Sequence, residues 1–216
     1  SDVALRAKLT PNYPVGCKRF LFADNFYPAL CLPHVDLETQ AITRFDKNGI
    51  FTTDEKHHQL DVIIYATGFE TTGWSWASQV QGTNGRKLSD LWVDGPQAYL
   101  GITTSGFPNF FMLYGPHTNL GHNSITFMME QQIGYIVQAL NGLIEKSAIS
   151  MNVLPKAQQA FFNMLQAQLA KTVWADPSCG SWYKNEKGQI TQNWGDSCTA
   201  YAQAVKDVVW DDYQIA

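Results

Sequence analysis

Two adjacent cations stand in the stretch Gly16-Cys17-Lys18-Arg19, directly before a segment with the composition of a strand. Cations at the start of a strand are suited to bind a phosphate or a developing anion, because arginine presents a permanent charge and a planar fork of donors. A solvated pair at the edge of a sheet is the commoner arrangement of such residues. The stretch by itself leaves both interpretations open.

An apolar run, Val62–Ala66, leads directly into Thr67-Gly68 and then Phe69. Such a near-continuous run predicts a strand that is covered on both faces, as in a parallel sheet between helices. The glycine after it is explained either by a simple turn or by a flat ligand against the end of the strand, where a Cβ atom would collide with that ligand.

A second apolar segment, 106–116, ends at Gly115-Pro116 and is followed by a polar loop. Apolar residues then recur at helical spacing over 121–145, which predicts a helix beginning near Gly121. The first turn of a helix carries unpaired N–H groups and a partial positive charge, and ligands gather beyond the carboxyl ends of strands in open α/β sheets. A plain strand–helix connection capped by asparagine or serine is the alternative.

A further candidate is the aromatic pair in Ser181-Trp182-Tyr183, which lies in a long polar loop. The pair could form a lid over a ligand. Packing of the loop onto the core is the commoner reason for aromatic residues in such a place.

The elements that must position these residues favour an α/β fold, because a hairpin returns into a buried strand. A turn signal at 46–49 predicts that hairpin, and His57-His58 lies in a stretch typical of a solvated turn. Further strands are expected at 18–23, 98–102 and 106–116. Helices are expected in a short turn after Asp24, near 88–92, and over 121–145, 155–173 and 198–209.

Composition and charge narrow the class of protein. The chain has 216 residues, of which 45% are hydrophobic and 16% charged, so it can bury a sizeable core. Its net charge of −4 argues against a nucleic-acid partner, and no apolar run approaches the roughly 18 to 20 residues of a membrane helix. The first residues lack the features of a signal peptide, so we expect a cytoplasmic protein, and the abrupt start suggests an excised fragment.

The cysteines and histidines do not indicate a metal site. No two of the four cysteines have CxxC spacing, and His117 and His122 lie five positions apart in a glycine-rich loop. Cys179 and Cys198 could form a disulfide, but a cytoplasmic protein favours buried free thiols.

These stretches follow one another in the order found in a known family. The chain resembles the C-terminal part of the flavin-dependent monooxygenases of the Baeyer–Villiger type, from about residue 9 to about residue 213. The matching text is YPVGCKRFLFADNFYPAL, the hairpin HVDLETQAITRFDKNGIFTTD, LDVIIYATGF, AYLGITTSGFPNFFMLYGP, the helix around 131–136 and CGSWYKNEKGQITQNW. ATGF alone is a weak motif, whereas the ordered set is specific.

Three signatures of this family are missing from the 216 residues: the GxGxxG fingerprints for FAD and for NADPH, and FxGxxxHxxxW. The resemblance therefore implies one part of an α/β flavoprotein with two dinucleotide-binding, Rossmann-like domains. Residues 1–60 would end the NADPH-binding domain with a β-hairpin. Residues 61–216 would return to the FAD-binding domain and add C-terminal helices and a mobile loop. The missing N-terminal half of the enzyme would be the partner of this chain.

In this family NADPH reduces FAD, O2 adds to the reduced flavin, and the resulting peroxyanion attacks the carbonyl of a ketone or other small organic substrate. By this resemblance Arg19 is the catalytic arginine, because a permanently charged guanidinium stabilises an anion without giving up a proton. Lys18 would bind the 2′-phosphate that distinguishes NADPH from NADH. Trp182 would close over nicotinamide and substrate.

The resemblance also assigns residues to the flavin and to the substrate. Thr67, Gly68 and Phe69 would cross beside the flavin, where small residues let the cofactor pack closely. The segment 115–124 would line the isoalloxazine ring and the substrate pocket. The expected cofactor-binding residues in it are Gly115, Pro116, Asn119, Asn123 and Ser124, and the expected substrate or lid residues are Leu120 and Ile125. His117 and Asn119 are not typical of this loop.

Two other functions remain open on the sequence. A sulfur- or nitrogen-oxidising flavin monooxygenase shares ATGF but usually lacks the GCKR arginine and the SWY loop. A non-catalytic folded fragment, or a partner-binding half, is the second alternative, because the chain lacks the glycine-rich turn that cradles a dinucleotide phosphate. We accordingly expect the chain alone to be inactive, to bind FAD weakly or not at all, and to self-associate through exposed apolar surface.

Overall fold

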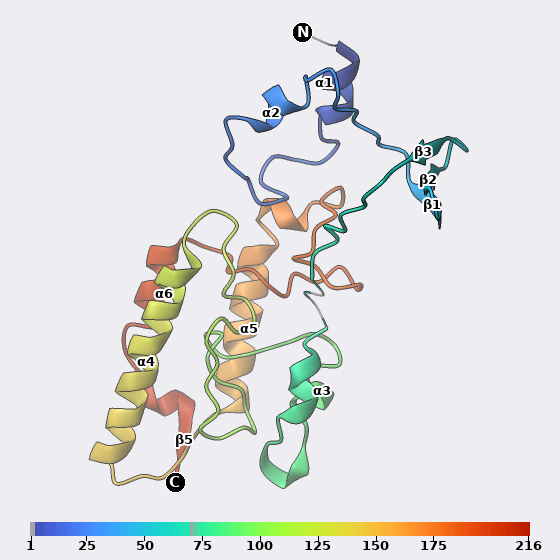
Figure 1. Ribbon diagram of the computed structural model, residues 1–216. Helices are drawn as coiled ribbons and strands as arrows, with labels where there is room; N and C mark the ends of the chain where they lie inside the picture. Colours follow the sequence, from blue (N-terminus) through green and yellow to red (C-terminus); the bar gives the residue numbers. More distant parts are fainter. Residues whose placement is uncertain (1–2, 70, 72) are drawn as a thin grey trace. The chain divides into compact units, whose positions relative to one another are not determined.

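The computed structural model describes residues 3–69, 71 and 73–216 and divides into two compact units (Figure 1). The N-terminal unit consists of Ser1–Asn12 and Leu21–Glu70. The C-terminal unit consists of Tyr13–Phe20 and Thr71–Ala216.

These units differ from the expected division after residue 60 in two places. Residues 61–70 belong with the N-terminal unit, and the short segment Tyr13–Phe20 belongs with the C-terminal unit. Lys18 and Arg19 are therefore in the same unit as the Trp182 loop. The assignment of the two parts of the chain to an NADPH-binding and an FAD-binding domain stays a prediction.

The N-terminal unit holds two short helices and one antiparallel sheet. Its strands pair in the order β1-β2-β3, which confirms the predicted hairpin. The carboxylate of Asp46 accepts a hydrogen bond from the N–H of Asn48 at 2.8 Å and so closes the turn. The elements are α1 (Val3–Leu9), α2 (Phe26–Ala29), β1 (Ile42–Asp46), β2 (Gly49–Thr52) and β3 (His57–Gln59).

The doublet His57-His58 forms β3, so the expectation of a solvated turn is wrong. His58 lies opposite Ile50 in the ladder, and the ring of His57 stacks on that of Phe51 with centroids 4.3 Å apart. Cross-strand contacts of this kind stabilise a strand whose own composition does not favour one.

The C-terminal unit is mainly helical and has one two-stranded antiparallel ribbon of β4 and β5. In it α6 packs beside α4 (Figure 1). The elements are α3 (Leu88–Leu91), α4 (Ile125–Glu145), β4 (Met151–Val153), α5 (Pro155–Leu169), α6 (Cys198–Ala204), β5 (Tyr213–Ile215) and the 3₁₀ turns Ser75–Gln79, Thr83–Gly85, Val173–Ala175 and Trp210–Asp212.

The long helices expected from periodicity are confirmed, with shifted ends. Helix α4 begins at Ile125 rather than near Gly121, because the Ser124 hydroxyl accepts a hydrogen bond from the N–H of Phe127 and caps it there. Helix α6 ends at Ala204, earlier than expected, where buried Val205 leaves the helical backbone conformation. None of the helices in the described part of the chain has the length and apolar composition needed to cross a membrane.

The strands expected at 18–23, 60–66, 98–102 and 106–116 do not form. Residues 98–116 are a series of turns closed by single bridges, because the backbone of Leu100 and Gly101 is left-handed, with φ of 55° and 69°. The run at 60–66 pairs with no strand among the described residues, and Val62 and Ile64 are 75% and 87% exposed. A stable strand needs a partner backbone for its N–H and C=O groups.

Tyrosines of the C-terminal core pair their hydroxyls inside it. The hydroxyls of Tyr135 and Tyr213 lie 2.8 Å apart. The Tyr201 hydroxyl accepts a hydrogen bond from Gln132 of α4 and donates one to the carbonyl oxygen of Leu100. These bonds satisfy the buried face of α4, because buried polar atoms are costly when they lack a partner.

Gly142 lies where α4 meets Trp210, and its lack of a side chain is required there. A Cβ atom on Gly142 would lie 2.0 Å from Cζ2 of Trp210. We therefore expect Gly142→Ala to lower the free energy of unfolding by about 1 to 3 kcal/mol, the cost of overpacking a close contact. Denaturant unfolding followed by tryptophan fluorescence measures this loss.

Gly134→Ala is the matched control, because Gly134 lies in the same helix and no described atom would lie within 4 Å of its Cβ. This exchange should be neutral or stabilising by up to about 1 kcal/mol, since alanine favours a helix more than glycine does. If both exchanges destabilise equally, the contact with Trp210 is not the cause.

Candidate functional site

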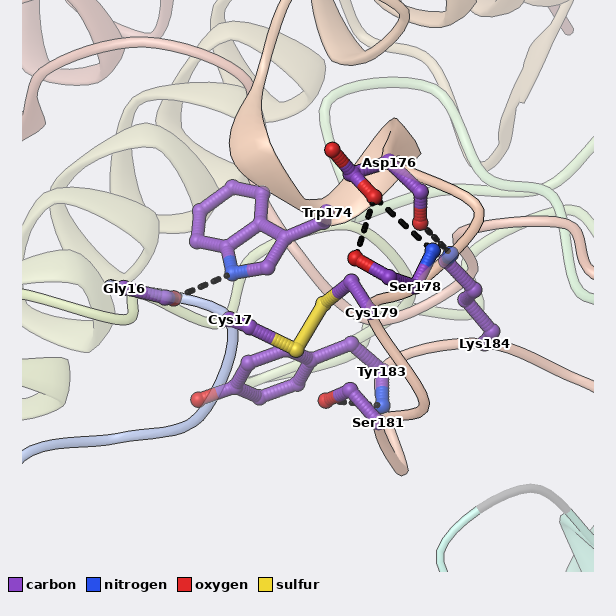
Figure 2. The surroundings of a disulfide bond; sticks show 9 residues. All are labelled: Gly16, Cys17, Trp174, Asp176, Ser178, Cys179, Ser181, Tyr183 and Lys184. Carbon is purple, nitrogen blue, oxygen red and sulfur yellow. Dashed lines mark hydrogen bonds between the residues drawn. A yellow bond between two sulfur atoms is a disulfide. The ribbon is translucent and has the colours of Figure 1, made fainter. Parts of the chain in front are cut away.

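A disulfide between Cys17 and Cys179 joins the segment that carries Lys18 and Arg19 to the loop that carries Trp182 (Figure 2). The two cysteines are separated by 162 positions in the sequence, and their Cα atoms lie 5.5 Å apart. Both are buried. The bond therefore fixes the main chain beside the two cations.

The pairing corrects the expectations for the cysteines. We expected buried free thiols, with Cys179–Cys198 as the alternative. Cys198 is free and half-buried, and Cys31 is free and exposed. Because Cys17 reaches Cys179 only through the folding of the whole C-terminal unit, spacing along the chain could not indicate this partner.

Hydrogen bonds hold both sides of the disulfide in place (Figure 2). The indole N–H of Trp174 donates to the carbonyl oxygen of Gly16 at 3.2 Å. In the opposite segment the carboxylate of Asp176 accepts from the N–H and the hydroxyl of Ser178, and the ammonium of Lys184 donates to the main-chain carbonyl of Asp176. These hydrogen bonds hold the loop together around Cys179, the residue that forms the disulfide.

The side chains of Lys18 and Arg19 are exposed and have no carboxylate within ion-pair distance in the part of the chain that the structure describes. The ammonium of Lys18 lies 4.6 Å from the centroid of the Tyr13 ring. Burial raises the pKa of Tyr114 and of Tyr183, and the charge of Arg19 lowers the pKa of both.

Trp182 and Tyr183 have different surroundings. Trp182 is 44% exposed, whereas Tyr183 is fully buried, and their ring centroids lie 4.4 Å apart. The Thr71 hydroxyl donates to the main-chain carbonyl of Trp182 at 3.5 Å, and Gln192 donates to the carbonyl of Thr71. The role of Trp182 as a lid stays a prediction.

The loop after Gly115 is fastened to a second loop, near residues 190–194. The N–H of Asn119 donates to the carbonyl of Gln192 at 2.9 Å. The side-chain oxygen of Asn119 accepts from the Tyr114 hydroxyl at 3.0 Å, and its amide nitrogen donates to Asn193 at 2.6 Å. Both polar ends of Asn119 are therefore paired inside the protein.

Four of the expected site residues in this loop are buried: Gly115, Pro116, Asn119 and Leu120. Gly115 is required by the chain itself, because a Cβ there would lie 2.3 Å from the carbonyl oxygen of Gly101. By contrast, Asn123 and Ser124 are exposed at the start of α4, and Ile125 is half-buried in its first turn.

The expected residues Thr67, Gly68 and Phe69 belong to the N-terminal unit, where all three are exposed. The backbone of Gly68 is left-handed, with φ of 80°. Glycine adopts this conformation readily, and this accounts for the residue at this position. No described atom would lie within 4 Å of a Cβ on Gly68, so this chain does not itself make the expected close approach.

His117 is buried, and its contacts are typical of a residue that supports the fold. Its Nε2 lies 3.0 Å from the carbonyl oxygen of Ile190, so this nitrogen is the donor. Burial lowers the pKa of His117 to about 4, which keeps the imidazole neutral. The described residues contain no group of three histidine, cysteine, aspartate or glutamate side chains that could hold a metal ion.

Tyr114 is a residue of this loop that no motif indicated, and its hydroxyl donates to the side-chain oxygen of Asn119. It lies within the expected strand 106–116, where its backbone is left-handed, with φ of 56°. The bond to Asn119 depends on the course of the loop between them, so no signal in the sequence could have indicated it.

Comparisons with known proteins give relatives that match nearly the whole chain, although no family model matches it. The FAD-binding monooxygenase ktnD of Aspergillus niger is 42% identical over 95% of this chain. A Baeyer–Villiger monooxygenase of Pseudomonas aeruginosa is 41% identical over 84% of it, and one of Streptomyces coelicolor is 34% identical over 99%. The chain spans only 34 to 41% of the lengths of these proteins.

Solved structures of monooxygenases also match the whole chain. An oxidized steroid monooxygenase bound to NADP matches all of this chain with a TM-score of 0.87 at 26% identity. OTEMO in complex with FAD and NADP matches it equally, with a TM-score of 0.87 at 26% identity. In both, the match covers 42% of the solved chain.

Proposed function

We propose that this chain contributes residues to an active site that uses NADPH, FAD and O2 to insert oxygen next to a ketone carbonyl. It is a part of a protein related to the FAD-binding and Baeyer–Villiger monooxygenases. The product of such a reaction is an ester or a lactone. The observation that carries the proposal is the match of the entire chain to a steroid monooxygenase. The same matches confirm the predicted family resemblance and the predicted α/β class, as part of a two-domain flavoprotein.

The residues of the C-terminal unit fit a site for anionic cofactors. FAD and NADPH carry phosphates, and Lys18 and Arg19 are two adjacent cations without a carboxylate partner in the described part of the chain. Such cations bind phosphate by charge pairing and hydrogen bonding. When bound, FAD supplies the redox chemistry with O2, which amino-acid side chains do not provide.

Arg19 would supply the fixed positive charge at the reacting atoms. Its guanidinium stays protonated, so it can stabilise negative charge without quenching the anion by proton donation. Trp182 stands half-exposed in a loop that the disulfide holds, and it would cover the nicotinamide and the substrate and exclude water.

The remaining expected residues would act in two ways. Thr67, Gly68 and Phe69 would contact the flavin directly, since they are exposed. Asn123 and Ser124 would reach the cofactor from the exposed start of α4, with Ile125 on the side of the substrate. The buried residues Gly115, Pro116, Asn119 and Leu120 would shape the loop between them. In this proposal 1–60 ends the NADPH-binding domain, and 61–216 belongs to the FAD-binding domain.

Lys18→Ala in the full-length protein should weaken the binding of NADPH far more than that of NADH. Loss of a hydrogen bond from a cation to the 2′-phosphate costs on the order of 1.5 to 3 kcal/mol, and NADH has no such phosphate. Dissociation constants of both cofactors for the variant and the parent test this. Lys171→Ala, which removes another exposed lysine of the same unit, is the control and should change neither. Equal losses for both cofactors would remove Lys18 from the 2′-phosphate.

Two alternatives have their own tests. The relatives ktnD and tazF are named only as FAD-binding monooxygenases, so a sulfur- or nitrogen-oxidising flavin monooxygenase is the first alternative. A panel of ketones, thioethers and amines decides between them by the oxygenated product that forms. A non-catalytic or partner-binding half is the second alternative, and an upstream reading frame with both dinucleotide fingerprints would exclude it for the parent.

Several apolar side chains of this chain are exposed, and we propose that the missing half of the enzyme covers them. They include Phe22, Val62, Ile64 and Phe69, each at least 75% exposed. The chain alone should therefore self-associate. Sedimentation across a concentration series should show growing species, and a strictly monomeric chain that does not bind an apolar dye would contradict this.

A further inference from the structure

The main chain that carries Arg19 is fastened to the C-terminal unit at Cys17. Cys17 is fully buried, and its N–H donates to the carbonyl of Pro14 at 3.1 Å. In residues 18–20, which follow it, the main chain makes no hydrogen bond with any described residue. The disulfide and the hydrogen bond of Cys17 are therefore the nearest bonds that hold Arg19 in the described part of the chain.

On the other side of the disulfide, Trp182 stands on a short tip between two buried residues. Cys179 and Tyr183 are at most 1% exposed, whereas Trp182 is 44% exposed. The carbonyl of Tyr183 accepts from the N–H of Thr191 at 3.1 Å, which fixes the far end of the tip. Only residues 180–182 lie between the two buried ends, so Trp182 can reach no farther from Cys179 than three residues allow, roughly 10 Å.

The disulfide gives a short covalent path between the cation and the tryptophan. Arg19 lies two positions after Cys17, at one end of the bond. Trp182 lies three positions after Cys179, at the other end. Along the chain the two cysteines are 162 positions apart, but their Cα atoms are separated by only 5.5 Å (Figure 2). No second disulfide joins these segments, because both of the other cysteines are free.

A catalytic charge and the group that covers the reacting atoms must act at the same place, because a displacement of about 1 Å can cost a rate factor of about 10². We propose that Cys17 and Cys179 are positioning residues for the candidate active site. Their disulfide keeps Arg19 and Trp182 in a constant relation to each other, so that the positive charge acts where the tryptophan excludes water. This inference rests on the proposed function of Arg19 and Trp182, and it assigns the bond a task besides its contribution to stability.

Single-glycine insertions test this in the full-length, FAD-loaded protein, because they leave the disulfide intact. A glycine inserted between Lys18 and Arg19 moves the guanidinium along the chain by up to about 3.5 Å relative to the disulfide. The ratio of oxygenated product to hydrogen peroxide should then fall at least about tenfold, while NADPH oxidation stays within about twofold. The matched control is a glycine inserted between Phe20 and Leu21. It does not change the distance from Cys17 to Arg19 and should leave the ratio unchanged.

The other outcomes of the insertions overturn the proposal. If the insertion after Phe20 lowers the ratio and the insertion before Arg19 does not, the chain that follows Arg19 places it, and the disulfide does not. An equal fall in both variants would mean that the effect does not depend on the distance from Cys17. If neither insertion changes the ratio, the position of Arg19 relative to the bond has no influence on the reaction.

Removal of the bond is the second test, again in the full-length protein. Cys17→Ser should lower the same ratio at least about tenfold in the molecules that remain folded. Unfolded molecules form neither product nor peroxide, so a loss of stability alone leaves the ratio unchanged. Gly142→Ala is the control, because it disturbs the contact with Trp210 in the same unit, and it should keep the parental ratio.

A measurement without activity shows whether the tip is released. In Cys17→Ser labelled with 5-fluorotryptophan, the ¹⁹F NMR signal of Trp182 should shift and broaden, because the chain around it gains slow motions. The signal is assigned by its absence in Trp182→Phe. The signal of Trp92, which is buried in a separate cluster of apolar residues of the same unit, should stay in place. An unchanged Trp182 signal overturns the positioning role.

The outcomes separate the two proposals. If Arg19→Ala keeps the parental product-to-peroxide ratio, the proposed function fails. If Arg19→Ala abolishes product but Cys17→Ser keeps the ratio, only the positioning role of the disulfide is overturned.

Discussion

Arg19→Ala in the full-length protein should yield a folded, FAD-loaded enzyme that consumes NADPH and O2 and releases hydrogen peroxide instead of an ester or lactone. The fold should persist because the Arg19 side chain is exposed and supports no part of the core. Product formation should fall by roughly 10² to 10³, the effect of removing one donor from a site where negative charge develops. Reduction of the flavin by NADPH should still occur, at an unchanged or a lower rate.

Arg19→Lys should be nearly as damaging, because a flexible ammonium does not reproduce the planar fork of the guanidinium. NADPH oxidation, peroxide and product are followed together with a panel of ketones. Arg86→Ala removes another exposed arginine of the C-terminal unit and should behave like the parent. Near-parental yield of oxygenated product from Arg19→Ala would make Arg19 an ordinary surface charge and overturn the central proposal.

The second large effect concerns the disulfide. Cys17→Ser or Cys179→Ser should lower the free energy of unfolding of the C-terminal unit by about 3 to 5 kcal/mol. The bond closes a loop of 162 positions, for which the loss of chain entropy in the unfolded state gives about 5 kcal/mol. The two single variants and the double variant should be equally unstable, because either exchange removes the same bond.

The measurement is denaturant unfolding without reductant, followed by tryptophan fluorescence. All seven tryptophans lie between residues 74 and 210, so this signal reports only the C-terminal unit. A dithiol reductant should bring the parent to the stability of the variants. Cys31→Ser is the control: Cys31 is free and exposed, so the change should stay within about 0.5 kcal/mol. Parental stability of Cys17→Ser would show that the bond contributes nothing.

The sequence by itself determined the elements whose signals are local. Helix α4 follows from apolar residues that recur every three to four positions, and α5 from the same pattern behind Pro155. The hairpin of β1 and β2 follows from the turn at 46–49. Each of these signals depends on residues within a few positions of one another, which is why they could be predicted. The order of the motifs likewise indicated the family.

Only the tertiary structure decided which distant groups meet. It paired Cys17 with Cys179, and it joined the side chain of Asn119 to those of Tyr114 and Asn193. It also turned the expected strands at 98–116 into turns. The physical reason is the same throughout: a disulfide, a hydrogen bond or a strand needs a second group in a defined place, and the packing of the whole unit decides which group arrives there. The residues around one position in the sequence do not indicate which distant group will be its partner.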